Sequence, residues 1–177
     1  MRPCFCYSSH VLEFITCFSG VYLALHYLNL NPTPNSSDSL KALIFIGSVA
    51  SWIGIGGAPQ YSGSKHAVLG IMRALSTAVR STPLRVGCIH PFFVDTGIVP
   101  RPLKLMLAGI PLTSVQRVAG AIFYAATDPD ERTNGSAWLL ADDGEVFMVP
   151  KEEFKLGVYA MLDRRVNGIR ACVFPSC

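Results

Sequence analysis

A tyrosine and a lysine stand four residues apart in the stretch GAPQYSGSK, which contains Tyr61 and Lys65. Side chains at this spacing share one face of a helix, so the Lys65 ammonium can lie close to the Tyr61 phenol. A nearby positive charge favours the phenolate, and the pair is therefore a candidate general acid/base. Tyrosine and lysine at this spacing also occur by chance on solvated helix faces, so the pair alone is a weak signal.

A serine supplies a third candidate group. Ser48 follows the apolar run LKALIFIG, which predicts a strand buried on both faces. Open α/β sheets bind ligands at the carboxyl ends of their strands, where the Ser48 hydroxyl can orient or polarise a substrate carbonyl. A strand-end serine, the glycine-rich loop IGIGGA, and a helical tyrosine and lysine in this order form a much more specific pattern than the pair alone.

The elements that must position these side chains alternate between helices and short apolar strands. The predicted order is helix 11–30, strand 40–47, helix 59–80, strand 84–90, helix 114–127 and strand 136–141. Helices of ten or more residues between such strands indicate a parallel α/β sheet. The length of 177 residues and the hydrophobic content of 50% suit a single domain with a substantial core.

Two of the predicted helices can be described further. Pro59 suits the first turn of helix 59–80, where its missing amide is no loss. The predicted buried face of this helix repeats every four residues, at Ala67, Ile71, Leu75 and Val79. Near the carboxyl end, the stretch KEEFKLGVYAMLDRRV predicts a surface helix whose inward-facing residues are Phe154, Val158, and Met161 or Leu162.

The charge distribution and the apolar segment 11–28 argue against a nucleic-acid partner and against a membrane or targeting segment. The formal net charge of +3 comes from scattered lysines and arginines without a basic patch, so nucleic acid is not expected as a partner. The apolar segment 11–28 contains Glu13 and His26 and lacks the features of a signal peptide. A buried helix is therefore favoured there over a membrane or targeting segment.

The six cysteines form no CxxC pair, which fits neither a structural zinc site nor a small disulfide scaffold. We therefore expect reduced thiols and a cytoplasmic protein. Cys88 and His90 suggest a metal pair. We expect the alternation of the predicted strand to place them apart, so no metal site is predicted.

A longer run connects these residues to a known family. The segment GSVASWIGIGGAPQYSGSKHAVLGIMRAL resembles the active-site segment of the short-chain dehydrogenase/reductases, in which the serine and the tyrosine are thirteen positions apart, as Ser48 and Tyr61 are. Downstream, LRVGCIHPFFVDTGI is similar to the family motif P-G-x-V-x-T, with Pro91, Val94 and Thr96 matching and Phe92 in place of the glycine. The resemblance covers most of the chain, from about residue 11 to 170.

The resemblance implies a partial doubly wound, Rossmann-like sheet and an oxidoreductase that uses NAD or NADP to interconvert a carbonyl and a secondary alcohol. Tyr61 would give or take the proton, Lys65 would favour the phenolate and hold the nicotinamide ribose, and Ser48 would bind the reacting oxygen. The loop with Pro91, Val94 and Thr96 would hold the nicotinamide carboxamide. In the segment TCFSGVYLALHYL, Cys17 stands where the family carries an asparagine of a water relay.

The dinucleotide-binding half of this fold begins with a glycine-rich turn after its first strand, and the sequence shows no such turn. The glycines of GIGG follow Ser48 and precede Tyr61, so they correspond to the family's substrate loop. The resemblance therefore assigns residues 1–177 to the catalytic half, as a single domain with about three strands. The open edge of strand 40–47 favours a homo-oligomer.

Three classes of function stay open. The first is an active NAD- or NADP-dependent oxidoreductase that acts on a small-molecule carbonyl or alcohol. The second is a truncated, catalytically inactive fragment or subunit that lacks the dinucleotide-binding motif. The third is an interaction module in which Tyr61 and Lys65 are ordinary surface residues. The sequence does not choose between NAD and NADP. Of the substrate it indicates only that the loop VPRPLKLMLAGIP makes an apolar lid with basic residues.

Overall fold

The computed structural model contains a four-stranded sheet with the order β1-β2-β3-β4. The structure describes residues 7–30, 41–80, 82–97, 99, 101–141, 144–153, 156–157 and 160–162. The strands are β1 (Lys41–Ile46), β2 (Leu84–Pro91), β3 (Ala137–Leu140) and β4 (Val146–Val149). The first three are parallel, and β4 pairs with β3 in the antiparallel direction. The predicted parallel α/β fold is confirmed. The sheet has four strands, whereas about three were expected.

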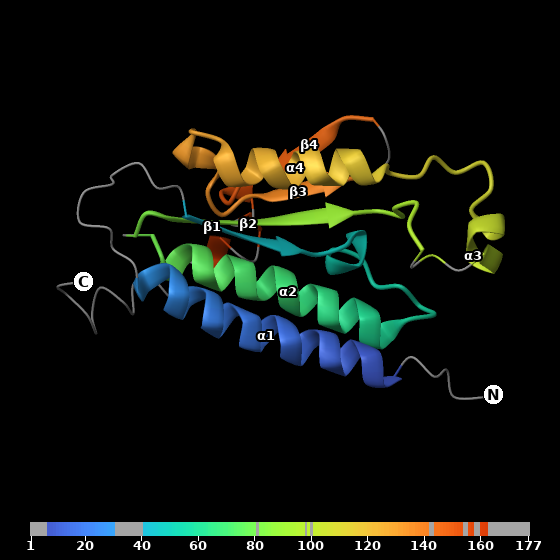
Figure 1. Cartoon of the computed structure of the whole chain (residues 1–177), viewed down its shortest axis with the longest axis horizontal. Coiled ribbons are helices and arrows are strands. Elements are labelled where there is room, and N and C mark those ends of the chain that lie inside the picture. Colours follow the sequence, from blue (N-terminus) through green and yellow to red (C-terminus); the bar gives the residue numbers. More distant parts are fainter. Residues whose placement is uncertain are drawn as a thin grey trace.

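The helices cover both faces of this sheet (Figure 1). They are α1 (Tyr7–Leu30), α2 (Pro59–Ala78), α3 (Arg101–Met106) and α4 (Val115–Thr127), with short 3-10 helices η1 (Val49–Ser51) and η2 (Glu131–Thr133). Helices α1 and α2 pack together on one face, and α4 packs on the other. The short helix α3 lies beyond the carboxyl end of β2, at the end of the molecule where η1 also lies.

The register of the parallel strands brings their carboxyl ends together. Ile46, the last residue of β1, pairs with Ile89, and Pro91 at the end of β2 pairs with Leu140 of β3. All eight residues of β2 are buried, as expected for a central strand covered by helices on both faces. Any side chains on the segments that leave β1 and β2 therefore gather at one edge of the sheet.

The core has two parts, one on each face of the sheet. The part under α1 and α2 contains Met72, which is fully buried, together with Val68 and Val79. Val79 is buried, as predicted. Within α2, Val68 and Met72 are buried in place of the predicted Ala67 and Ile71, so the face that packs in the core is offset there by one position. Ala67, Ile71 and Leu75 are only half-buried.

Helix α1 begins at Tyr7, ahead of the predicted start, and packs against α2 through a row of partly buried residues that includes Val21 and Leu25. Its other side exposes large apolar residues: Ile15, Phe18, Tyr22, Leu23 and Tyr27. Within the part of the chain that the structure describes, no helix combines the length and apolarity needed to cross a bilayer.

Only part of the predicted surface helix near the carboxyl end can be compared with the structure. Phe154 and Val158 lie outside the described residues. Met161 and Leu162 are in a helical turn and are exposed, which corrects the expectation that one of them faces inward.

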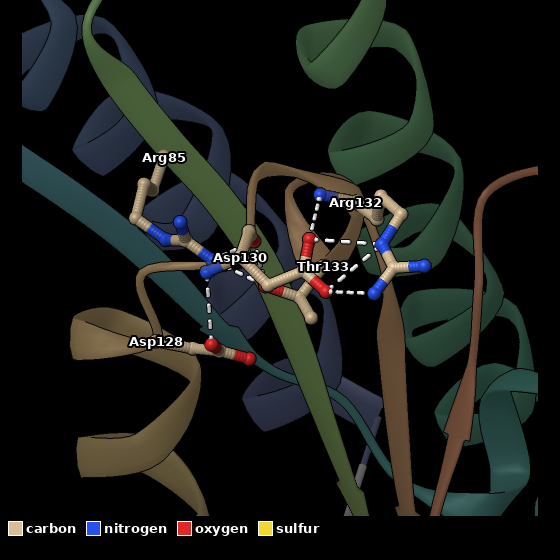
Figure 2. A network of polar contacts seen from close by, with 5 residues as sticks. All are labelled: Arg85, Asp128, Asp130, Arg132 and Thr133. Carbon is tan, nitrogen blue, oxygen red and sulfur yellow. Dashed lines mark hydrogen bonds and ion pairs between the residues drawn. The ribbon is translucent and has the colours of Figure 1, made fainter.

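A buried arginine anchors the segment after α4 to the start of β2 (Figure 2). Arg85 is 7% exposed, and its guanidinium donates to the Thr133 hydroxyl and, at 3.3 Å, to the Asp130 carbonyl. The Asp128 carboxylate points toward the same guanidinium. The Asp130 carboxylate points away, to Arg132, which holds the pKa of that carboxyl below its usual range. One terminal nitrogen of the buried guanidinium thus has acceptors, as burial of a charge requires, while Nε has no hydrogen-bond partner among the described residues.

Candidate active site

Ser48 lies in a tight turn directly after β1. Its hydroxyl accepts a hydrogen bond from the Ala50 backbone N–H at 3.2 Å, while the Ser51 hydroxyl accepts from the Ser48 N–H at 3.2 Å. This reciprocal arrangement is a capping box, here at the start of η1. The turn is therefore held by both serine side chains, and it fixes Ser48 at the carboxyl end of β1.

Tyr61 and Lys65 lie in the first turns of α2. Pro59 occupies the first helical position, where a preset φ favours helix initiation. The Lys65 ammonium lies 5.7 Å from the centre of the Tyr61 ring, and it donates to the Ile46 carbonyl at 3.4 Å. Lys65 is only 8% exposed, whereas Tyr61 is half-buried. The structure therefore brings the lysine both to the tyrosine and to the strand end that carries Ser48.

The glycine-rich loop between η1 and α2 is attached to the same helix. The Ile55 N–H donates to the Ser62 hydroxyl at 2.9 Å, and Ser62 is buried beside Tyr61 in the chain. Gly54, Gly56 and Gly57 are exposed. The hydrogen bond from Ile55 to Ser62 thus attaches the loop between Ser48 and Tyr61 to α2, while the glycines of the loop are exposed to solvent.

The loop after β2 lies at the same edge of the sheet. Pro91 ends the strand, and the Phe92 N–H donates to the Leu140 carbonyl at 2.8 Å. Val94 pairs with Thr113, and the Thr96 N–H donates to the Val94 carbonyl at 2.8 Å.

Phe92, in place of the family's glycine, is compatible with this loop. None of the described non-glycine residues has a positive φ, so the position does not need glycine. The Phe92 ring packs edge-on against Phe93, with ring centroids 4.7 Å apart.

The predicted lid contains the short helix α3, where the sequence indicated only an apolar loop. Lys104 of α3 forms an ion pair with Asp95, beside Val94 and Thr96 in the chain. Both side chains are largely exposed, so the pair contributes little to stability, but it connects the lid to the loop after β2.

His90 is a group at this edge that was not among the predicted site residues. Its side chain is fully buried, its Nδ1 lies 3.1 Å from the Ser48 carbonyl oxygen, and its ring packs edge-on against Trp52. Burial, with a smaller contribution from the Lys65 ammonium, lowers the pKa of His90 to about 4, against the opposing effect of the bond to Ser48. The signal available in the sequence was a histidine near the end of an apolar strand.

Cys88 and His90 lie on the same side of β2, which corrects the expectation that they would point apart. Residues two positions apart on a strand share a face. Cys88 packs in the core under α2, and burial raises the pKa of its thiol to about 12, with Lys65 and Cys17 close enough to affect it. The thiol is therefore protonated at neutral pH. In the described ranges, no three His, Cys, Asp or Glu side chains cluster as metal ligands.

The stability of the fold is expected to fall in mild acid because of His90. The folded chain holds His90 neutral down to about pH 4, whereas the unfolded chain takes up the proton near 6.5. The contribution of His90 to the free energy of unfolding is therefore complete above pH 6.5 and is lost as the pH falls to about 4. Urea unfolding across this window measures it, with His90→Asn as the reference that lacks the titration. Parallel pH profiles for the two proteins would contradict the assignment.

Comparisons with known proteins find similar sequences and a similar fold. Residues 30–102, which include Ser48, Tyr61, Lys65 and Thr96, match the family model described as short chain dehydrogenase. The chain is 26% identical to xanthoxin dehydrogenase of Arabidopsis thaliana over 84% of its own length and 56% of that relative. It is 32% identical to a 3-oxoacyl-[acyl-carrier-protein] reductase of Chlamydia trachomatis over 58% of its length and 44% of that relative.

A solved structure has the same fold. The 4-hydroxyisoleucine dehydrogenase complexed with NADH superposes with a TM-score of 0.55 and 19% identity, covering 72% of this chain and 53% of that one. The chain spans about half the length of these relatives. The match to the family model, the curated relatives and the arrangement of the sheet and helices agree. In sequence and in fold, the chain is therefore similar to the short-chain dehydrogenase/reductases.

Proposed function

We propose that the chain carries the catalytic groups of an NAD(P)-dependent oxidoreductase that interconverts a carbonyl and a secondary alcohol. The observation that carries the proposal is the buried Lys65 ammonium, which lies 5.7 Å from the Tyr61 ring centre and is bound to the carbonyl at the end of β1. Burying an ammonium costs free energy unless the charge is paired or hydrogen-bonded. Next to a phenol at the edge where α/β sheets bind ligands, that charge favours the phenolate in proton transfer.

Three residues of this chain would have distinct roles. Tyr61 would give a proton to the carbonyl oxygen during reduction and take it back during oxidation. Lys65 would stabilise the phenolate form, and Ser48 would orient the reacting oxygen through its hydroxyl. The capping box and the Ile46 carbonyl support these roles, because they fix Ser48 and Lys65 before a substrate arrives.

The described residues fit the nicotinamide end of the cofactor. The loop with Pro91, Val94 and Thr96 follows β2 at the edge where Lys65 contacts β1, and it offers backbone groups and a hydroxyl to a carboxamide. When bound, the nicotinamide would supply or accept the hydride. Two solved structures of 4-hydroxyisoleucine dehydrogenase with a similar fold are complexes with NADH, which supports this choice of cofactor. The choice between NAD and NADP is left to experiment.

The test is a fluorescence titration of the purified chain with NADH and with NADPH, followed by turnover of a panel of small ketones and secondary alcohols. We expect binding that NAD⁺ or NADP⁺ competes with, and Lys65→Met to weaken it. Lys41→Met is the matched control, because Lys41 also donates to a backbone carbonyl, that of Leu28 at 2.6 Å, but at the opposite end of β1. Equal affinity for the Lys65→Met and Lys41→Met variants would contradict the site.

A second candidate is a subunit or fragment without turnover of its own. The glycine-rich loop in the described part of the chain, at Gly54–Gly57, connects Ser48 to Tyr61, and no second loop of this kind follows a strand in the described ranges. The backbone amides of such a second loop would hold a pyrophosphate. This candidate predicts much weaker binding than that of a full-length relative measured in parallel, and no turnover. Binding as tight as that of the relative would exclude it.

A further inference from the structure

His90 is a fully buried histidine whose two ring nitrogens have different surroundings. Nδ1 lies 3.1 Å from the Ser48 carbonyl oxygen, whereas Nε2 has no hydrogen-bond partner among the described residues. A carbonyl oxygen only accepts, so Nδ1 carries the hydrogen and donates it. The ring is therefore a neutral donor that reaches from β2 to the turn after β1.

This bond is a side-chain hydrogen bond from the neighbouring strand to the Ser48 turn, beside the backbone bond from the Gly47 N–H to the Ile89 carbonyl at 2.8 Å. The Ser48 carbonyl also accepts from the Ser51 N–H at 2.9 Å, within the turn. The capping box likewise stays within residues 48–51. These local bonds fix the shape of the turn, and the His90 bond adds a fixed orientation relative to β2.

The position of the ring is determined by its neighbours. A Cβ at Gly47 would lie 2.6 Å from His90 Cε1 and closer still to Nδ1, so the ring occupies the space that glycine leaves. On another side the Trp52 ring meets it edge-on, with ring centroids 5.4 Å apart. His90 is thus held where a small rotation of its ring would break the bond to Ser48.

We infer that His90 is a positioning residue, which holds the Ser48 turn against β2 so that the Ser48 hydroxyl faces the reacting oxygen. This inference rests on the proposed function of Ser48. It predicts that the Nδ1 donor matters more than the volume of the side chain.

Three substitutions separate the donor from the volume. In His90→Asn, the amide nitrogen takes about the place of Nδ1 and donates to Ser48. In His90→Gln, the amide nitrogen takes about the place of Nε2. In His90→Leu, the apolar volume is kept and the donor is lost. A core-filling role predicts that leucine is tolerated better than asparagine, and a positioning role predicts the reverse.

The first measurement is steady-state turnover of a model ketone by the whole chain. We expect His90→Asn to stay within about threefold of the wild type, and His90→Leu to lose about tenfold in kcat, the scale of one hydrogen bond. The cofactor affinity is expected to be unchanged in both, because His90 is buried behind the turn. Leucine equal to or better than asparagine would overturn the inference, and glutamine better than asparagine would move the role to Nε2.

The second measurement is amide hydrogen exchange at Ser51 and Trp52, whose N–H groups close the turn onto the Ser48 and Val49 carbonyls. We expect faster exchange at both amides in His90→Leu, by about tenfold, and near wild-type protection in His90→Asn. This measurement does not need catalysis. If the wild type has no turnover, the proposed function fails while the exchange still decides whether His90 holds the turn. Equal exchange in all variants would overturn the inference even in an active protein.

Discussion

Replacing Tyr61 with phenylalanine is expected to lower kcat by about 10²–10⁴-fold, the range that a positioned general acid/base contributes. The change removes one hydroxyl and keeps the ring, so the packing of α2 against the sheet is retained. Cofactor binding is expected to change much less than kcat. Steady-state kinetics with a model ketone, together with a cofactor titration, measure the two effects separately.

Tyr124→Phe is the matched control for Tyr61→Phe. Tyr124 lies on α4, on the opposite face of the sheet, and packs edge-on against Trp138 with ring centroids 5.4 Å apart. Its side chain is 54% exposed, and loss of its hydroxyl is expected to leave turnover unchanged. If the two variants have the same activity, Tyr61 is not the acid/base.

Replacing Gly47 with alanine is expected to destabilise the fold by about 3 kcal/mol, the upper part of the range for overpacked buried sites. The added Cβ would lie 2.6 Å from His90 Cε1, and this ring is enclosed by Trp52 and cannot swing aside like a flexible chain end. The ring or the turn must therefore move. We also expect turnover to fall, because Ser48 is the next residue.

The substitution Gly70→Ala is expected to have the opposite effect on stability and to stabilise the fold. Gly70 lies inside α2 and is exposed, and a Cβ added there would meet no other atom within 4 Å. Alanine in a helix interior is more stable than glycine by about 0.5–1 kcal/mol. Urea unfolding followed by tryptophan fluorescence compares both variants with the wild type. A Gly47→Ala protein as stable as the wild type would show that the space beside His90 is not filled as described.

The sequence predicted the elements that have strong periodic patterns. The strands LKALIFIG and LRVGCIH and the helix that carries Tyr61 and Lys65 were found because long apolar runs and a proline at a helix start are local signals. The closeness of Lys65 to Tyr61 followed from helical spacing alone. These features need no information about which strand lies beside which.

The features that were missed depend on tertiary contacts. The four residues of β4, VFMV, are too few for a periodic signal, and they form a strand because β3 offers them an edge. The buried face of α2 depends on its packing against both α1 and the sheet. His90 contacts Ser48, which is 42 positions away in the sequence. Such a pair is brought together only by the register of β1 and β2.

The strand β2 has a buried polar group near each end, Arg85 at the amino end and His90 at the carboxyl end. Five residues of strand separate them by about 16 Å. Effects of substitutions at that separation usually add, since the sites share no partner. The anchoring of the fold by Arg85 and the arrangement of the proposed site are thus independently variable. Over evolutionary time, the loops around Ser48 and Thr96 can change in sequence while the opposite end of the sheet keeps the chain folded.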